Sequence, residues 1–398
     1  MKISYILLLL SLFSFIVIGL LGEEVDIGVG NVEDEDDFIM KKNVQQRNLI
    51  RENIKPTSIL NNYQKYYIKT DHRNFGENDN NIKTLAYLTP WNKKGFESSV
   101  MFREKFTHLS PVWFQIKPYS PSPNTLIIEG QHNVDKEWIF KIKNGNNRTL
   151  IVPRFNFEGE SLTLQLLHQE FQSKRFIDSL VKTITDNDFD GLVMEGIYYV
   201  ENRQIRKHFL ENLSNLLHKL GKQLFIVIQP IHKNSQRAIS FTKEDVSELS
   251  AFVDGFSLMT YDFDPRNADN SPIHWMRDNL KYFLGDDIQN INQYISKKIL
   301  MGVPFYGYKH SLATNEFHAV MSWDFTEVLE KNSKGKFQWN QATYEHNFSY
   351  KDSNNYNMKL TYPTLLFLDE RLKLAKQYHC SISIWELGQG MNYFYDLL

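Results

Sequence analysis

FQSKRFIDSLVKTITDNDFDGLVMEGI, residues 171–197, contains the pattern that indicates the fold. Its first part has an apolar stripe at helical spacing, made by Phe176, Ile177, Leu180, Val181 and Ile184. FDGLVMEGI (189–197) follows at once as a short apolar strand. The unit repeats, because RKHFLENLSNLLHKL (206–220) is an amphipathic helix that Gly221 ends, and LFIVIQP (224–230) is again a strand. This alternation predicts parallel strands buried in one sheet.

Six further apolar runs extend the pattern in both directions. They are TLAYLT (84–89), SPVWFQI (110–116), LIVPRFNF (150–157), FVDGFSLMTYD (252–262), ILMGVPFYG (299–307) and SISIWELG (381–388). Eight such strands with intervening helices over residues 84–398 predict an α/β fold, a (β/α)8 TIM barrel. The alternative is a doubly wound open sheet, but no glycine-rich phosphate loop follows the first strand. Residues 308–362, between strand seven and its helix (364–378), predict a small α+β insertion.

The ends of the chain differ from this body. Residues 1–22 have the pattern of a signal peptide: a positively charged start at Lys2, an apolar stretch from Ile6 to Leu21, and the small residue Gly22. An uncleaved membrane anchor is the alternative. Residues 23–83 are acidic and polar and predict a linker or loosely attached arm, with one helix near 40–52. We therefore expect a secreted or lysosomal protein. The sequons at Asn147, Asn212 and Asn347 fit that route, and Asn147 is the strongest glycosylation candidate.

Composition narrows the class of function. The 398 residues are 42% hydrophobic and 14% aromatic, with a net charge of −2, which gives no basic footprint for a nucleic acid. The lone Cys380 excludes an internal disulfide and predicts a buried inert thiol. No HExxH or similarly spaced cluster occurs, so we expect neither a metal nor a cofactor. The 7 Trp, 20 Tyr and 28 Phe exceed what a core needs and suit a ligand cleft.

The carboxyl ends of barrel strands are where functional groups are expected. The residues there are Trp91, Trp113, Glu158, Glu195, Tyr261, Asp262, Tyr306, Trp385 and Glu386. Acids and aromatic rings dominate and cations are few, which is typical of a saccharide cleft and unlike a phosphate site. Each ring has a core role as its plainer interpretation.

Four of these blocks resemble a known family. FDGLVMEGIYY, FVDGFSLMTYD, ILMGVPFYG and SISIWELGQG occur in the order and spacing of glycoside hydrolase family 18, the chitinase-like barrels. With YLTPWN (87–92) and SPVWFQIK (110–117), the resemblance is to the chitinase domain-containing protein 1 group within it, from about Leu85 to the end. The resemblance implies a TIM barrel that acts on, or binds, N-acetylglucosamine-containing sugars.

The family's catalytic strand resembles FDGxDxDxE, in which the final Glu protonates the leaving oxygen and the substrate's own N-acetyl group is the nucleophile. In this sequence Asp190 is retained, whereas Val193, Glu195 and Ile197 hold the three positions that alternate toward the barrel interior. Ile197, at the acid position, cannot exchange a proton. Glu195 lies two residues deeper, about 6.6 Å along the strand at ~3.3 Å per residue, too far to replace it. We therefore expect no hydrolysis of the usual kind.

The binding half of the site is retained in this resemblance. Trp385 matches the tryptophan that forms the floor under the sugar, and Tyr261, Asp262 and Met259 match residues around the N-acetyl group. With Trp91 and Glu195, these are the expected saccharide contacts; the plainer interpretation is that Trp385 and Tyr261 only plug the barrel.

Three hypotheses follow. The first is a chitinase-like lectin that binds chitin-like oligosaccharides without cleaving them. The second is a weak glycosidase with a relocated acid: Glu195, Asp262 or Glu386. The third is a protein-interaction scaffold with a vestigial cleft, docking a partner such as a receptor. We expect a monomer with oligosaccharide ligands, no nucleic acid and no membrane span once the signal is removed.

Overall fold

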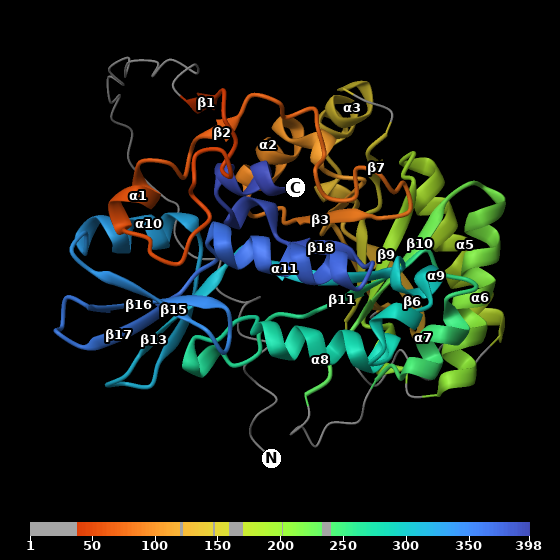
Figure 1. The fold of residues 1–398 in the computed structure, drawn as a ribbon. Helices are drawn as coiled ribbons and strands as arrows, with labels where there is room; N and C mark the ends of the chain where they lie inside the picture. The colour runs from red at the N-terminus through yellow and green to blue at the C-terminus, as the bar shows by residue number, and fades with distance from the viewer. Residues whose placement is uncertain (1–37, 120–121, 146–147, 159–169, 201, 233–239) are drawn as a thin grey trace, which may run out of the picture. The chain divides into compact units, whose positions relative to one another are not determined.

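The structure is a computed structural model that describes residues 38–119, 122–145, 148–158, 170–200, 202–232 and 240–398. Its centre is a ring of eight parallel strands (Figure 1). They are β3 (Thr84–Leu88), β4 (His108–Pro111) continued by β5 (Phe114–Tyr119), β7 (Leu150–Ile151) continued by β8 (Arg154–Phe157), β9 (Gly191–Glu195), β10 (Gln223–Ile228), β11 (Gly255–Leu258), β12 (Ile299–Pro304) and β18 (Ser381–Trp385). Most of their residues are buried, as apolar parallel strands require.

The ring closes through its second and third strands. The sheet runs β8-β9-β10-β11-β12-β18-β3-β4, and β4 pairs with β7 while β5 pairs with β8. At the closure, the Val152 N–H donates to Leu109 O at 2.9 Å, and the Asp190 N–H donates to Ile151 O at 2.8 Å. A doubly wound sheet would have two open edges here. The closure confirms the predicted TIM barrel.

Helices surround the ring in the order expected for βα units (Figure 1). They are α2 (Lys93–Met101), α3 (Lys136–Gly145), α5 (Glu170–Asp186), α6 (Arg203–Lys219), α7 (Lys243–Leu249), α8 (Ile273–Leu284), α9 (Gln293–Ser296) and α11 (Leu365–Gln377). A capping box begins α7: the Thr242 hydroxyl accepts from the Asp245 N–H, and the Asp245 carboxylate accepts from the Thr242 N–H. Asn202 caps α6 in a similar way.

A small α+β lobe is inserted between β12 and α11, as the sequence predicts. It consists of β13 (Gly307–Ser311), β14 (Phe317–Val320), α10 (Ser322–Lys331), β15 (Lys336–Asn340), β16 (Glu345–Lys351) and β17 (Asn357–Thr361). The five strands form an antiparallel sheet in the order β14-β13-β17-β16-β15. A second addition is β6 (Ser122–Glu129), which forms a hairpin with β5.

Residues 38–83 differ from the loose arm that we expected. The parallel pair β1 (Ile39–Met40) and β2 (Tyr66–Tyr67) and the short α1 (Pro56–Leu60) lie here, while the helix expected near 40–52 is replaced by a turn. Val44 and Phe75 are buried, and Asp396 accepts from the Tyr67 N–H at 2.7 Å and pairs with Arg47 at 3.3 Å. The few apolar residues of this segment pack onto the barrel. The sequence did not indicate this packing, because the average composition of the segment is polar. Residues 1–22 and 23–37 lie outside the described residues.

Candidate functional site

Trp385 ends β18 at the carboxyl end of the barrel and is half-buried. Two side chains support its ring from other strands. The Tyr87 ring of β3 lies 5.2 Å from it between centroids, and the Arg154 guanidinium carbon of β8 lies 5.8 Å from its centroid. Tyr87 is itself fixed by a 2.9 Å hydrogen bond from its hydroxyl to Ser257 Oγ. The ring is therefore held by two neighbouring side chains and retains some contact with solvent.

The arginine next to this ring belongs to an ion pair. Arg154 Nε donates to Glu195 Oε2, and the two side chains are only 12% and 15% exposed. The strand register explains the contact, because β8 and β9 pair Arg154 with Val193 and Asn156 with Glu195. Although burial lowers the pKa of Arg154, the Glu195 carboxylate raises it above its ordinary value. The pair is a closed unit whose charges neutralise each other.

Strand alternation ends before the expected acid position. β9 stops at Glu195, and Gly196 takes a φ of +83°, where a Cβ would lie 2.9 Å from that of Phe157. Ile197 then begins a 3-10 turn, Ile197–Tyr199, and is fully buried. Alternation along one strand predicts that Ile197 faces inward together with Val193 and Glu195. Because the strand ends at Glu195, Ile197 does not continue that inward face. Its side chain is apolar and enclosed.

Asp190, the retained acid of the motif, lies at the other end of β9. Its Oδ2 accepts from the Ile151 N–H at 2.8 Å, and its Oδ1 is 3.8 Å from Lys143 Nζ. These contacts tie β9 to β7 and to α3. The described contacts of Asp190 are thus those of a structural residue.

The acid of the MTYD block binds two tyrosines, Tyr306 after β12 and Tyr308 of the inserted lobe. Asp262 has a φ of +62°, and its Oδ1 accepts a 2.6 Å hydrogen bond from the Tyr308 hydroxyl and another from that of Tyr306. The protein around the carboxyl group raises the pKa of Asp262, and the two hydroxyl donors oppose that shift. Asp262 keeps contact with solvent, and Tyr261 beside it is half-buried. Tyr308 belongs to β13, so the inserted lobe contributes to this end of the barrel.

The remaining expected contacts are spread more widely. Met259 is half-buried just after β11, and its N–H donates to Ile228 O at 3.2 Å. Trp91 lies on the turn between β3 and α2 and is 74% exposed. A ring so exposed is unusual for an apolar side chain and is available to a ligand or a partner.

Three strand-end residues do not face this site in the way that we expected. Trp113 is a core ring, fully buried and 5.7 Å from the Trp138 ring. Glu158 is exposed. Glu386 is fully buried: it accepts from Asn92 Nδ2 at 2.7 Å and from the Gly388 N–H at 3.1 Å. Burial raises the pKa of Glu386 to about 7, against those hydrogen bonds. It anchors the turn that carries Trp91.

Sequence reasoning missed three site residues: Arg154, Tyr87 and Tyr308. All lie on strands that the sequence identifies or directly after one. A signal exists for Arg154, because Phe155 and Phe157 are buried and their neighbours must face the opposite side. A cation on that side next to the inward-facing Glu195 indicates an ion pair. For Tyr308 no such signal exists, since its partner Asp262 is 46 residues away.

Several other expectations concern modification and metals. Asn212 lies half-buried within α6 and Asn347 half-buried on β16, while Asn147 falls outside the described residues. Glycosylation stays a prediction. Cys380 is a buried free thiol whose pKa burial raises. Among the described residues, no cluster of three His, Cys, Asp or Glu side chains is suited to a metal ion. Within that same part of the chain, no helix combines the length and apolarity needed to cross a bilayer.

Comparison with known proteins identifies relatives of this barrel. The family model for glycosyl hydrolases family 18 matches residues 83–390. The uncharacterized glycosylase YvbX of Bacillus subtilis (strain 168) is 21% identical over 251 residues, which are 61% of this chain and 70% of that protein.

Solved structures agree at the level of the fold. A chitinase from Chromobacterium violaceum ATCC 12472 superposes with a TM-score of 0.66 at 17% identity, over 79% of this chain and 98% of that one. YKL-39, solved in the presence of chitooligosaccharides (GlcNAc4), gives a TM-score of 0.62 at 17% identity, again over 79% and 98%. The resemblance to the chitinase domain-containing protein 1 group stays a prediction.

Proposed function

The chain belongs to glycosyl hydrolases family 18, and from this we propose that it is a chitinase-like lectin, which binds N-acetylglucosamine-type oligosaccharides without hydrolysing them. One observation carries the proposal. The half-buried Trp385 ring is supported at the carboxyl ends of the strands, while the carboxylate closest to it in the motif, Glu195, is bound by Arg154. The site has a platform for a sugar and lacks a free acid at the motif.

Sugar binding is supported by the chemistry around Trp385. An aromatic face stacks on the C–H face of a pyranose ring, and a ring that is already fixed loses little entropy on binding. Tyr87 and Arg154 pack against it and restrict its motion. Asp262 and Tyr308 offer hydrogen-bonding groups for sugar hydroxyls. That YKL-39 was solved with a chitooligosaccharide supports this ligand class.

The absence of hydrolysis follows from the state of the acids. Ile197 is buried and apolar, and Glu195 makes a direct ion pair with a guanidinium, so neither offers a proton to a glycosidic oxygen. Loss of the general acid alone reduces turnover by about 10²–10⁴-fold. Glu386 cannot replace it, because it is fully buried among Asn92 and Gly388.

Calorimetric titration of chitotetraose into the full chain tests the proposal. We expect saturating heat for the wild type and none for Trp385→Ala. The matched control is Trp323→Ala, which removes an exposed tryptophan of α10 that takes no part in the described site. We expect this control to bind as the wild type does.

Three results would contradict the proposal. Equal binding by Trp385→Ala and by the wild type would show that the Trp385 ring does not bind the sugar. Heat that continues at a constant rate after each injection would mean turnover. Binding of no oligosaccharide at millimolar concentration would favour the protein-interaction scaffold instead.

One observation favours a weak glycosidase as the second candidate. Asp262 follows β11 at the carboxyl end of the barrel, is in contact with solvent and has a raised pKa, which suits a proton donor. If it acts in this way, Asp262→Asn abolishes a slow release of N-acetylglucosamine that the wild type shows over days. For either function we propose a secreted or lysosomal location, which sequencing the N-terminus of protein recovered from culture medium would test.

A further inference from the structure

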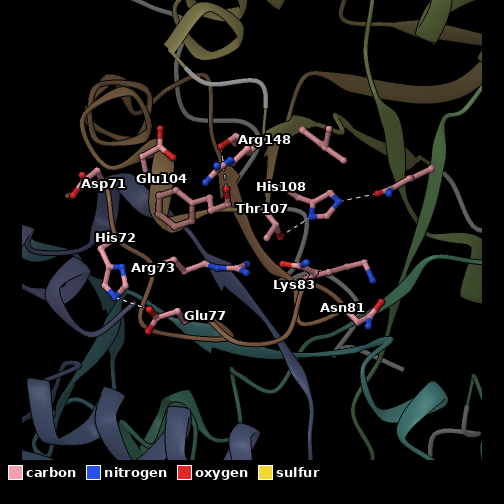
Figure 2. A pocket seen from close by; sticks show the side chains of 15 residues that line it. Asp71, His72, Arg73, Glu77, Asn81, Lys83, Glu104, Thr107, His108 and Arg148 are labelled. Carbon is pink, nitrogen blue, oxygen red and sulfur yellow. Dashed lines mark hydrogen bonds and ion pairs between the residues drawn. The ribbon is translucent and has the colours of Figure 1, made fainter. Parts of the chain in front are cut away.

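A pocket of about 840 Å³ lies at the amino ends of the barrel strands, at the opposite end from Trp385. Lys83 precedes β3, His108 begins β4 and Leu150 begins β7, so three consecutive strands form one wall, and Gln223 at the start of β10 joins it from beyond β9. The segment 71–81 forms the other wall. Figure 2 shows long side chains reaching into this space from different sides. The volume is within the range of small-ligand sites.

Two cations of this pocket lack a directly bound counterion. Arg73 is half-buried, and its guanidinium donates to the carbonyl oxygens of Ile82 at 3.2 Å and Gly76 at 3.1 Å. Lys83 is also half-buried, and within the described residues its ammonium group has neither a hydrogen bond nor a salt bridge. Burial lowers the pKa of both groups. A half-buried cation without a counterion is costly, and an anion nearby relieves that cost.

The acids of the pocket wall do not supply that anion. Asp71 and Glu77 are exposed at the rim, and Glu77 is 3.2 Å from His72 Nε2. Glu104 is half-buried, but its Oε1 lies 3.6 Å from Arg103 Nε. These carboxylates therefore either lie at the exposed rim of the pocket or are bound to another side chain.

Two more carboxylates act on Lys83 through space, and both have closer partners. Asp254 accepts from the Leu224 N–H at 2.8 Å and from His218 Nε2 at 2.9 Å. Asp79 is 2.8 Å from Lys297 Nζ. The ammonium group of Lys83 therefore remains open to a ligand.

Arg148 adds a third cation to the pocket wall, Phe106 and Leu150 are apolar, and the other wall residues are polar and uncharged. His108 bonds through Nε2 to Gln223 Oε1 at 2.7 Å, and burial lowers its pKa to about 3, so the imidazole is neutral. Thr107, Asn80 and Asn81 add hydroxyl and amide groups. Such groups recognise the hydroxyls of a sugar rather than a purely inorganic ion.

We propose that this pocket binds a small acidic sugar, a monosaccharide that carries one carboxylate or sulfate group, with the anionic group directed at Arg73 and Lys83. The size of the pocket admits a sugar ring, the two cations recognise the charge, and the amides and hydroxyls recognise the ring. The site is independent of the proposed oligosaccharide site at the other end of the barrel.

Calorimetric titration of the full chain with glucuronate and with N-acetylglucosamine 6-sulfate tests the proposal. The wild type is expected to bind at least one of them, and Lys83→Met is expected to weaken that binding about 10- to 100-fold, because one charge-assisted contact is lost. Lys83→Met keeps the aliphatic stem and breaks no described hydrogen bond. Lys219→Met, at the exposed end of α6, is the matched control and should bind normally.

Four outcomes would overturn the proposal. They are no binding of either acidic sugar at millimolar concentration, equal binding by Lys83→Met, equal binding of neutral N-acetylglucosamine at this site, and equally tight binding of inorganic sulfate, which would mean a simple anion site. Repeating the titration with Trp385→Ala separates the two sites: the acidic sugar should bind this variant normally, even if the oligosaccharide proposal fails.

Discussion

The two ends of the barrel treat charge in opposite ways. At the carboxyl end, Arg154 and Glu195 bind each other next to Trp385. At the amino end, the cations Arg73 and Lys83 line a pocket. Arg73 donates only to carbonyl oxygens, and the described residues give the ammonium group of Lys83 no direct partner. The same fold thus presents a neutral aromatic platform at one end and uncompensated positive charge at the other.

This difference teaches what each end can bind. A charge that already has its partner offers little to a charged ligand, so the carboxyl end suits a neutral sugar that stacks on a ring. A charge without a partner gains from an anion, so the amino end suits an acidic ligand. The contrast also predicts that removing a cation changes the free energy of unfolding in opposite directions at the two ends.

The largest effect is expected where the ion pair is broken. Arg154→Met leaves the Glu195 carboxylate without its cation in a site that is 15% exposed, and it should lower the free energy of unfolding by about 3–5 kcal/mol. Urea denaturation at pH 7 measures this change. Adding Glu195→Leu should recover most of the loss, because both charges are then absent.

An exposed ion pair provides the control for that experiment. Lys182 and Asp186 of α5 are 2.6 Å apart and 73% and 57% exposed, so Lys182→Met should cost about 1 kcal/mol or less. If Arg154→Met costs no more than this control, the Arg154–Glu195 pair is not the closed unit described above.

The strands and most helices were predictable because their signals are local. Each barrel strand is a short apolar run, and the stripes of α5 and α6 repeat at 3.6 residues. The capping box at Thr242 depends on residues three apart. Residues 38–83 were mispredicted, because their contacts with Asp396 and its neighbours join opposite ends of the chain.

The site was less predictable, since it depends on which way a side chain points after a strand ends. Trp113 follows β4 and turns into the core, whereas Trp385 ends β18 and faces the site. Gly196 ends the alternation of β9, so the position of Ile197 could not be extrapolated from Glu195. The open cations Arg73 and Lys83 at the amino end matched no motif, because two cations ten residues apart in a polar segment carry no recognisable spacing.

The second-largest effect is expected at Glu386, a buried acid that has no cation bound to it. Burial raises the pKa of Glu386 to about 7 from an ordinary 4.5, so the folded state binds more protons than the unfolded state between these pH values. Its contribution to stability is complete below pH 4.5 and is lost as the pH rises through about 7. The free energy of unfolding should therefore fall by up to about 3 kcal/mol across this window.

Glu386→Gln isolates this contribution, since an amide does not titrate and can still accept from Asn92. We expect the stability of the variant, relative to the wild type, to increase as the pH rises from 5 to 8, measured by urea denaturation at each pH. A difference that is constant with pH would show that the buried carboxyl group does not titrate in this range.

The smallest effect, and the one of opposite sign, is expected at the amino end. Lys83→Met removes a half-buried charge that burial disfavours and that no directly bound carboxylate compensates. Without ligand, the free energy of unfolding should stay the same or rise by about 1 kcal/mol at most. The same substitution class costs several kcal/mol at Arg154, so the two variants measured side by side by urea denaturation compare the two ends directly. A loss at Lys83 as large as that at Arg154 would mean that its charge is already compensated within the fold, and the pocket would then have no charge to offer an acidic sugar.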